Sequence, residues 1–243
     1  TVSADLSISG RTAKTDYYVS LGFFDQTGIE PNSFMTRYSV RSNINTKLTD
    51  WLKFGVNLGL TYQESRTQGY TTGNSWYNPM SIADWNLPYA VPYEILTYSN
   101  GKFKGYGEEQ DYITDMGTYN YYYLTKWQPR ANNYVRLNGN TYQEITPLKG
   151  LTIRAAQALE GYDYRNSGKI LKDPLGAFAS STGAWETFSR SYGLTATNTI
   201  EYKFDIAEKN HFILLAGQEA IVNKYESFGA ESSDLADNRT AGV

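Results

Sequence analysis

The sequence predicts an all-β protein built from antiparallel up-and-down hairpins. Apolar and polar residues alternate with a period of two in one segment after another, which is the pattern of strands with one apolar face. Thr, Asn, Ser, Gly and Tyr are abundant, whereas Lys and Glu, the usual residues of solvated helices, are sparse. Short turns also alternate with long connections, so we expect hairpins with tight turns at one end and long loops at the other.

Four strands are expected in the N-terminal part of the chain. They lie within residues 2–10, 15–28, 34–47 and 48–65, with a tight turn at Thr49-Asp50 before the fourth. The fourth strand has the longest apolar stripe, made of Leu52, Phe54, Val56, Leu58, Leu60 and Tyr62. Its other face has Lys, Gly, Asn, Thr and Gln.

Four more strands are expected within residues 132–144, 148–162, 191–204 and 211–225. Short turns around Thr146-Pro147 and Ala207–Asn210 join them in pairs. The remaining connections, at about 65–133 and 166–186, are long. A loop of that length is uncommon in a compact soluble domain and is usually functional.

The apolar stripe has two interpretations, a soluble β core or a surface against lipid. The polar reverse face, the strands of 10–14 residues and the aromatic residues at strand ends favour lipid. A strand of about 10 residues, rising ~3.3 Å per residue and tilted near 45°, covers ~23 Å, close to the ~25 Å apolar band of an outer-membrane barrel. The pattern alone leaves both interpretations open.

Composition excludes several classes of function. The chain has no cysteine, so disulfides and thiolate chemistry are absent. The net charge of −3 argues against nucleic-acid binding. No apolar run is long enough for a transmembrane helix, and the chain starts directly in strand-like sequence without a signal peptide, so we expect a mature chain or a piece of a longer one.

Four blocks of sequence carry a family resemblance. They are SISGRTAKTDYYVSLGFFDQTGI (7–29), RYSVRSNINTKLTDWLKFGVNLGL (37–60), NNYVRLNGNTYQEITPLKGLTIRAA (132–156) and HFILLAGQEAIVNKYESF (211–228). In this order they resemble the barrel of SusC/RagA-type TonB-linked outer-membrane transporters. Arg11, where the family usually has glycine, and Ala155-Ala156, in place of bulkier residues, depart from the pattern.

The resemblance implies that residues 1–243 are an internal segment of a large transmembrane β-barrel of about 22 strands, without the plug domain and the rest of the barrel. It also implies uptake of oligosaccharides, or of peptides in some branches, across the outer membrane of a Gram-negative bacterium. A SusD-like surface lipoprotein and TonB would be the partners, and the apolar stripe would meet lipid. The alternatives are a soluble β-sandwich that binds carbohydrate and an autonomous eight-stranded membrane barrel.

The residues indicate binding rather than catalysis. His211 has no visible catalytic partner, and we expect neither an enzyme active site nor a cofactor. Glu108, Glu109, Asp111 and Asp115 offer the oxygen ligands that Ca²⁺ prefers, but their spacing matches no calcium loop, and a solvated loop is the simpler reading. Aromatic rings of the long loop are candidates for stacking on a ligand: Trp76, Tyr77, Trp85, Tyr89, Tyr93, Tyr121 and Trp127. The alternative is that these rings pack the loop itself.

Overall fold

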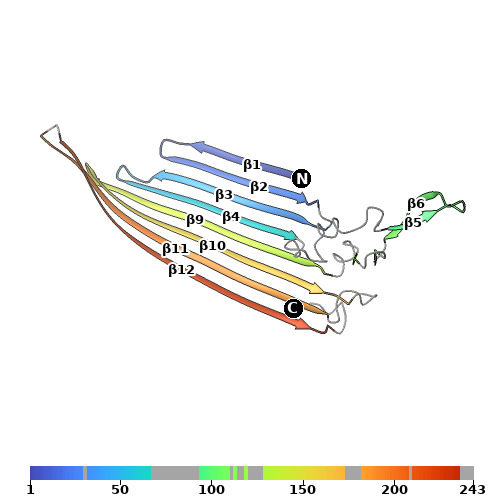
Figure 1. Cartoon of the computed structure of the whole chain (residues 1–243). Helices are drawn as coiled ribbons and strands as arrows, with labels where there is room; N and C mark the ends of the chain where they lie inside the picture. Colours follow the sequence, from blue (N-terminus) through green and yellow to red (C-terminus); the bar gives the residue numbers. More distant parts are fainter. Residues whose placement is uncertain are drawn as a thin grey trace.

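The computed structural model of the chain describes residues 1–29, 32–66, 93–109, 112–113, 118–119, 128–172, 182–207 and 210–235. Its main body is a single eight-stranded sheet in the order β1-β2-β3-β4-β9-β10-β11-β12 (Figure 1). The strands are β1 Val2–Arg11, β2 Thr15–Thr27, β3 Phe34–Lys47, β4 Leu52–Arg66, β9 Arg130–Leu148, β10 Leu151–Ile170, β11 Gly183–Ile206 and β12 Asn210–Ser233.

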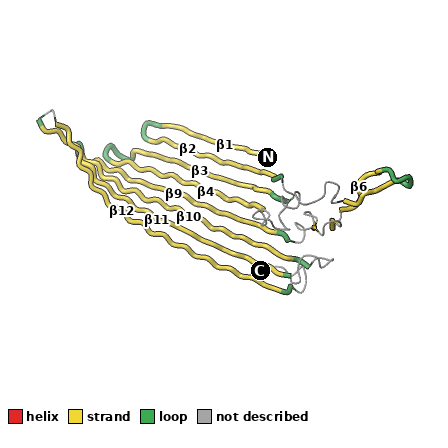
Figure 2. Tube along the Cα trace, viewed as in Figure 1, coloured by secondary structure: helices red, strands yellow, loops and turns green. Residues whose placement is uncertain are grey.

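Neighbours in this sheet are antiparallel and follow one another along the chain, apart from an excursion between β4 and β9. The expected all-β, up-and-down hairpin fold is therefore confirmed. The short turns lie at one end of the sheet and the long connections leave from the other (Figure 2). We call these the turn end and the loop end.

The excursion between β4 and β9 contains strands that the sequence pattern did not predict. Strand β5 (Tyr93–Thr97) pairs with β6 (Phe103–Glu109), and β7 (Tyr112–Ile113) pairs with β8 (Thr118–Tyr119). These short ribbons are separate from the main sheet. Treating the connection as loop throughout was therefore wrong for these residues.

The turn between β9 and β10 lies at Lys149-Gly150 and not at Thr146-Pro147. Pro147, which lacks an N–H group, falls where the pairing of β9 with β10 shifts register, and such irregularities tolerate proline. Gly150 has a φ of 86°, a left-handed conformation, and a Cβ there would lie 2.2 Å from the carbonyl oxygen of Lys203. The turn therefore requires glycine, and proline was a misleading signal.

The last three strands are longer than the sequence pattern predicts. β10 has 20 residues, and β11 and β12 have 24 each. Their extra length includes parts of the predicted 166–186 loop, because Asn166 pairs with Thr187 and Ile170 with Gly183. The connection between β10 and β11 is therefore shorter than expected.

The sheet has almost no core among the described residues. Ala184 is their single buried apolar side chain. Leu6 and Leu21 are opposite each other on adjacent strands, yet they are 62% and 50% exposed. No helix among the described residues is long and apolar enough to cross a membrane. Within the described part, no second layer covers the apolar side chains, so the soluble β-sandwich interpretation is not what the structure presents.

Candidate functional site

Apolar side chains form a continuous band on one face of the main sheet. Directly paired residues of antiparallel strands share a face, and Leu60 pairs with both Val40 and Leu137, while Leu194 pairs with Leu159 and Val222. This apolar band consists of exposed Leu6, Ile8, Val19, Leu21, Val40, Leu58, Leu60, Leu137, Leu159, Leu194 and Val222. The predicted stripe Leu52, Phe54, Val56, Leu58, Leu60 and Tyr62 belongs to the same face. That this face meets lipid remains a prediction.

Aromatic rings border the band on both sides. Toward the loop end, Phe23, Tyr38 and Tyr62 form a row across β2, β3 and β4, with ring centroids 5.3 and 6.4 Å apart. Toward the turn end, Phe204 stacks at 5.3 Å on both Tyr202 and Phe212. Two such rows at the edges of an apolar surface are the arrangement of an interfacial aromatic girdle.

Charged pairs replace apolar residues on the same face beyond the band. Toward the loop end of β10 and β11, Arg190 bonds both carboxylate oxygens of Asp163 at 2.7 Å, and Arg165 bonds those of Glu186 at 2.6 and 2.7 Å. These bonds lower the pKa of Asp163 and of Glu186, against a weaker opposing effect of desolvation. On the face of the band, the outer parts of β10 and β11 therefore mix charged pairs with Phe188, which pairs with Phe228 of β12.

The edge of the band runs obliquely to the rows of paired residues. One row joins Tyr62, Val135, Asp163, Arg190 and Glu226, and it changes from aromatic to charged between β4 and β12. On β10 and β11 the loop-end edge of the band lies two to four residues nearer the turn end than it does on β4. This is a shift of roughly 7–13 Å over two to three strand spacings of ~4.8 Å. The edge of the band is therefore inclined to the rows of paired residues by roughly 25–55°, and the strands are tilted from the normal to the band by the same angle. This range contains the tilt of barrel strands.

The opposite, polar face has cross-strand hydrogen bonds in its middle. Asn57 donates to Asn140 at 2.6 Å between β4 and β9. The ring of Tyr142 lies across Gly55, where a Cβ would be 2.0 Å from it. Its hydroxyl donates to Asn45 at 2.9 Å, and the Arg154 guanidinium lies 4.5 Å from its centroid. Glycine opposite an aromatic residue lets the ring lie flat on the sheet.

Amide and aromatic side chains gather at the loop end of the polar face. Tyr164 and Asn166 both donate to the side-chain oxygen of Asn132, at 3.0 Å for Tyr164, and the Trp185 indole donates to Asn166 at 3.4 Å. The Arg130 guanidinium lies 5.1 Å from the Trp185 ring. We call Arg130, Asn132, Tyr164, Asn166 and Trp185 the loop-end cluster.

Nearby, Tyr134 stacks on Tyr162 at 5.9 Å beside a cavity of about 290 Å³. Flat rings beside hydrogen-bonding amides suit sugar faces or peptide side chains and backbone. The loop-end cluster was missed at the level of sequence, because its members come together only through the registers of β9, β10 and β11. The one available signal was the polar and aromatic alternation within these strands.

Most ligand candidates taken from the sequence lie outside the described residues: Trp76, Tyr77, Trp85, Tyr89, Tyr121 and Trp127. Tyr93 begins β5, where the backbone alone is described, and the same holds for Glu108 and Glu109 in β6. Asp111 and Asp115 also lie outside. The described residues contain no group of three metal-ligating side chains. Ligand contact and calcium binding in this loop stay predictions.

His211 has a partner that the sequence analysis did not find. Its Nδ1 lies 2.5 Å from the Asp205 carboxylate, across the turn between β11 and β12. Both side chains are largely exposed, at 74% and 65%. The expectation of a histidine at the edge of a turn fits this position, and the paired residues Asp205 and His211 could have been read from the hairpin register.

Known proteins are similar to this chain in sequence and in fold. No family model matches it. TonB-dependent receptor P26 of Formosa agariphila is 25% identical over 251 residues, which cover 99% of this chain and 22% of that protein. The chain thus spans less than a quarter of this curated relative.

Solved structures match over nearly the whole chain. The RagAB peptide transporter superposes with a TM-score of 0.80 at 28% identity, covering 98% of this chain and 26% of that one. The open-open state of the RagAB peptide importer gives a TM-score of 0.82, also at 28% identity and with the same coverage. The ferric preacinetobactin receptor BauA of Acinetobacter baumannii, at 9% identity and a TM-score of 0.53 over 94% of this chain and 29% of that one, shares the fold alone.

Proposed function

We propose that this chain, which has the fold and sequence blocks of a SusC/RagA-type TonB-linked transporter segment, forms part of the wall of an outer-membrane nutrient importer. The observation that carries the proposal is the apolar band, with aromatic rings at its loop-end edge on β2, β3 and β4 and at its turn-end edge on β11 and β12. A surface of this kind, exposed on a single-layered sheet, is suited to the hydrocarbon of a bilayer. The hydrogen-bonded polar face would then line the interior of the barrel.

The orientation of the sheet follows from the lengths of its connections. Outer-membrane barrels have short turns on the periplasmic side and longer loops outside. The turn end would therefore face the periplasm, and the loop end, with the loop-end cluster, would face the outside. A sheet with two open edges, β1 and β12, requires further strands, so we place the chain within a longer protein that closes the barrel and supplies the plug.

Import would be gated passage without covalent chemistry. TonB would supply energy through parts of the protein outside this chain, and a SusD-like lipoprotein would cover the loop end. Homologues are named as receptors and transporters and not as enzymes. The polar face would provide hydrogen-bonding groups along this passage, such as Asn57 and Asn140.

Two substrate classes are compatible with the loop-end cluster. The similarity to peptide transporters favours peptides, whose backbone can exchange hydrogen bonds with Asn132 and Asn166. The rings of Tyr134, Tyr162 and Trp185 favour oligosaccharides, because sugar faces stack on aromatic rings. Both share the same route along the polar face.

The proposal is tested in the native host with the intact gene. Membrane fractionation should place the protein in the outer membrane, released only by detergent. Deletion of the gene should abolish growth on one polymeric nutrient, with peptide mixtures and oligosaccharides supplied in separate cultures. Trp185→Ala should weaken that growth, whereas Trp51→Ala, at the turn end, should not. A product that is soluble without detergent would refute the proposal.

A further inference from the structure

A basic cavity lies on the polar face at the turn end of the sheet. It has a volume of about 680 Å³, within the range of ligand-binding pockets, and is open to solvent. The cavity is lined by the β1–β2 turn, the C-terminal end of β3 and the start of β4, and Tyr142 of β9 forms one wall. Four cationic side chains line this turn-end cavity: Arg11, Lys14, Lys47 and Lys53.

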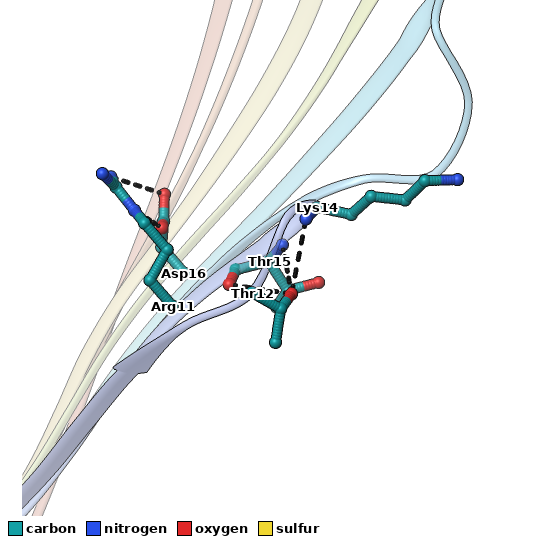
Figure 3. A network of polar contacts seen from close by, with 5 residues as sticks. All are labelled: Arg11, Thr12, Lys14, Thr15 and Asp16. Carbon is teal, nitrogen blue, oxygen red and sulfur yellow. Dashed lines mark hydrogen bonds and ion pairs between the residues drawn. The ribbon is translucent and has the colours of Figure 1, made fainter.

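Two of the four cations are already paired. Arg11 donates two hydrogen bonds to Asp16 across β1 and β2 (Figure 3). Lys53 bonds Glu144 at 2.7 Å. Asp16 is the one acidic residue in the lining, and Glu144, the partner of Lys53, is not part of the lining. The paired residues hold the cavity walls in place and leave little charge for a ligand.

Lys14 and Lys47 make no ion pair with any described residue. The Lys14 ammonium group donates to no described residue, and its side chain extends away from the Arg11–Asp16 pair (Figure 3). Lys47 is close enough to Asp16 to act on it electrostatically, but it is not in contact with it. The backbones of the two lysines are joined by a hydrogen bond of 2.7 Å from the Lys47 N–H to the Lys14 carbonyl. The cavity therefore has two spare positive charges on adjoining backbone.

Several other polar groups that line the cavity already have partners. The Thr12 hydroxyl accepts from the N–H groups of Lys14 and Thr15, at 3.3 and 3.0 Å, and the Tyr142 hydroxyl donates to Asn45. Phosphate sites in proteins commonly combine a lysine charge with a fork of Arg donors or a nest of free backbone N–H groups. Here the guanidinium of Arg11 is already bonded to Asp16, and the N–H groups of Lys14 and Thr15 are bonded to the Thr12 hydroxyl. Two single ammonium charges suit two separate carboxylates better than one compact phosphate.

We propose that the turn-end cavity binds an acidic polypeptide segment, with Lys14 and Lys47 each receiving a carboxylate. The cavity is on the polar face, so a lipid headgroup beside the apolar band cannot reach it. Its volume accommodates a few residues of extended chain, and its net positive charge complements Asp or Glu side chains. This binding site is at the opposite end of the polar face from the loop-end cluster.

The test is binding of a fluorescent pentaglutamate peptide to the detergent-solubilised protein, followed by fluorescence anisotropy. Pentaglutamine is the neutral control peptide. We compare the unaltered protein with Lys14→Gln, Lys47→Gln, the double variant and Lys149→Gln. Lys149 is an exposed lysine in the turn between β9 and β10, outside the cavity, so it controls for general loss of charge. Circular dichroism checks that each variant keeps its strand content.

The expected result is that pentaglutamate binds, more weakly as salt is raised, and that pentaglutamine does not. The double variant should bind about tenfold more weakly, as the loss of two exposed charge contacts predicts, and Lys149→Gln should bind normally. The double variant Lys14→Arg/Lys47→Arg should retain binding. Equal losses in the double glutamine variant and Lys149→Gln would overturn the proposal. The proposal would also be overturned if inorganic phosphate or phosphatidylglycerol vesicles displaced the peptide at a concentration of negative charge lower than that of the peptide itself. The measurement involves no transport, so its failure is separate from failure of the importer proposal.

Discussion

Replacing Gly55 with alanine should destabilise the sheet, although alanine is normally the better residue in a strand. The reason is Tyr142, whose ring occupies the place of the missing Cβ, 2.0 Å from it. In Gly55→Ala the ring must leave the surface of the sheet. It then loses its hydrogen bond to Asn45 and its contact with Arg154.

The magnitude follows from these contacts. The lost hydrogen bond contributes about 1 kcal/mol and the cation–π contact about 0.5–1 kcal/mol. Alanine in place of glycine raises the free energy of unfolding by about 0.5–1 kcal/mol, because it reduces the conformational freedom of the unfolded chain. The net change should be a loss of about 1 kcal/mol in the free energy of unfolding, before any residual clash.

A double-mutant cycle with Tyr142→Ala isolates this mechanism. Equilibrium unfolding of the intact protein in guanidinium chloride, monitored by circular dichroism, supplies the free energies. In the Tyr142→Ala background no ring is displaced, so Gly55→Ala should stabilise the protein by about 0.5–1 kcal/mol. If Gly55→Ala has the same sign in both backgrounds, the ring is not the cause and the reasoning is wrong.

Three further predictions concern the apolar band, an ion pair beyond it and a turn. Leu58→Arg should cost about 2–4 kcal/mol in unfolding from lipid vesicles if the band meets hydrocarbon, whereas Asn57→Arg on the polar face should cost far less; equal costs would contradict the assigned faces. The pKa of Asp163 is lowered by Arg190, so the pair adds stability above the ordinary aspartate pKa and loses it as the pH falls below about 4. Asp163→Asn should therefore flatten the acid limb of a stability–pH profile, and an unchanged profile would refute the pairing. Gly150→Ala should destabilise by more than about 1 kcal/mol in thermal unfolding, because its φ of 86° is unfavourable for alanine; a neutral result would exclude the left-handed turn.

Period-two alternation was sufficient to predict the eight strands of the sheet and their order. For β3 it gave the observed bounds, Phe34–Lys47. The reason is that the whole of this segment has the same surroundings, with an apolar surface along one face of the strand. The tight turn after β3 was also correct, with the Leu48 N–H bonded to the Leu52 carbonyl at 2.9 Å.

The pattern failed where strands continue beyond the apolar band. In β11 the residues from Gly183 to Arg190 are mixed on both faces, because neither face is required to be apolar there. Only pairing with β10 keeps them extended, and single-sequence reasoning does not contain that register. The loop-end cluster escaped prediction for the same reason, since Asn132 and Asn166 are 34 residues apart and meet only through the register of β9 and β10.

The oblique course of the apolar band also has a mechanical consequence. Hydrogen bonds between antiparallel strands run perpendicular to the strands, and in a sheet whose band meets a bilayer, as proposed above, the strands would be tilted within the membrane. A pull along the membrane normal then has a large component along the strands. That component loads many interstrand bonds of a long pair such as β11 and β12 together, so they share the force and do not open one after another. A wall built this way can withstand traction on a plug or ligand inside it while its own pairing stays intact.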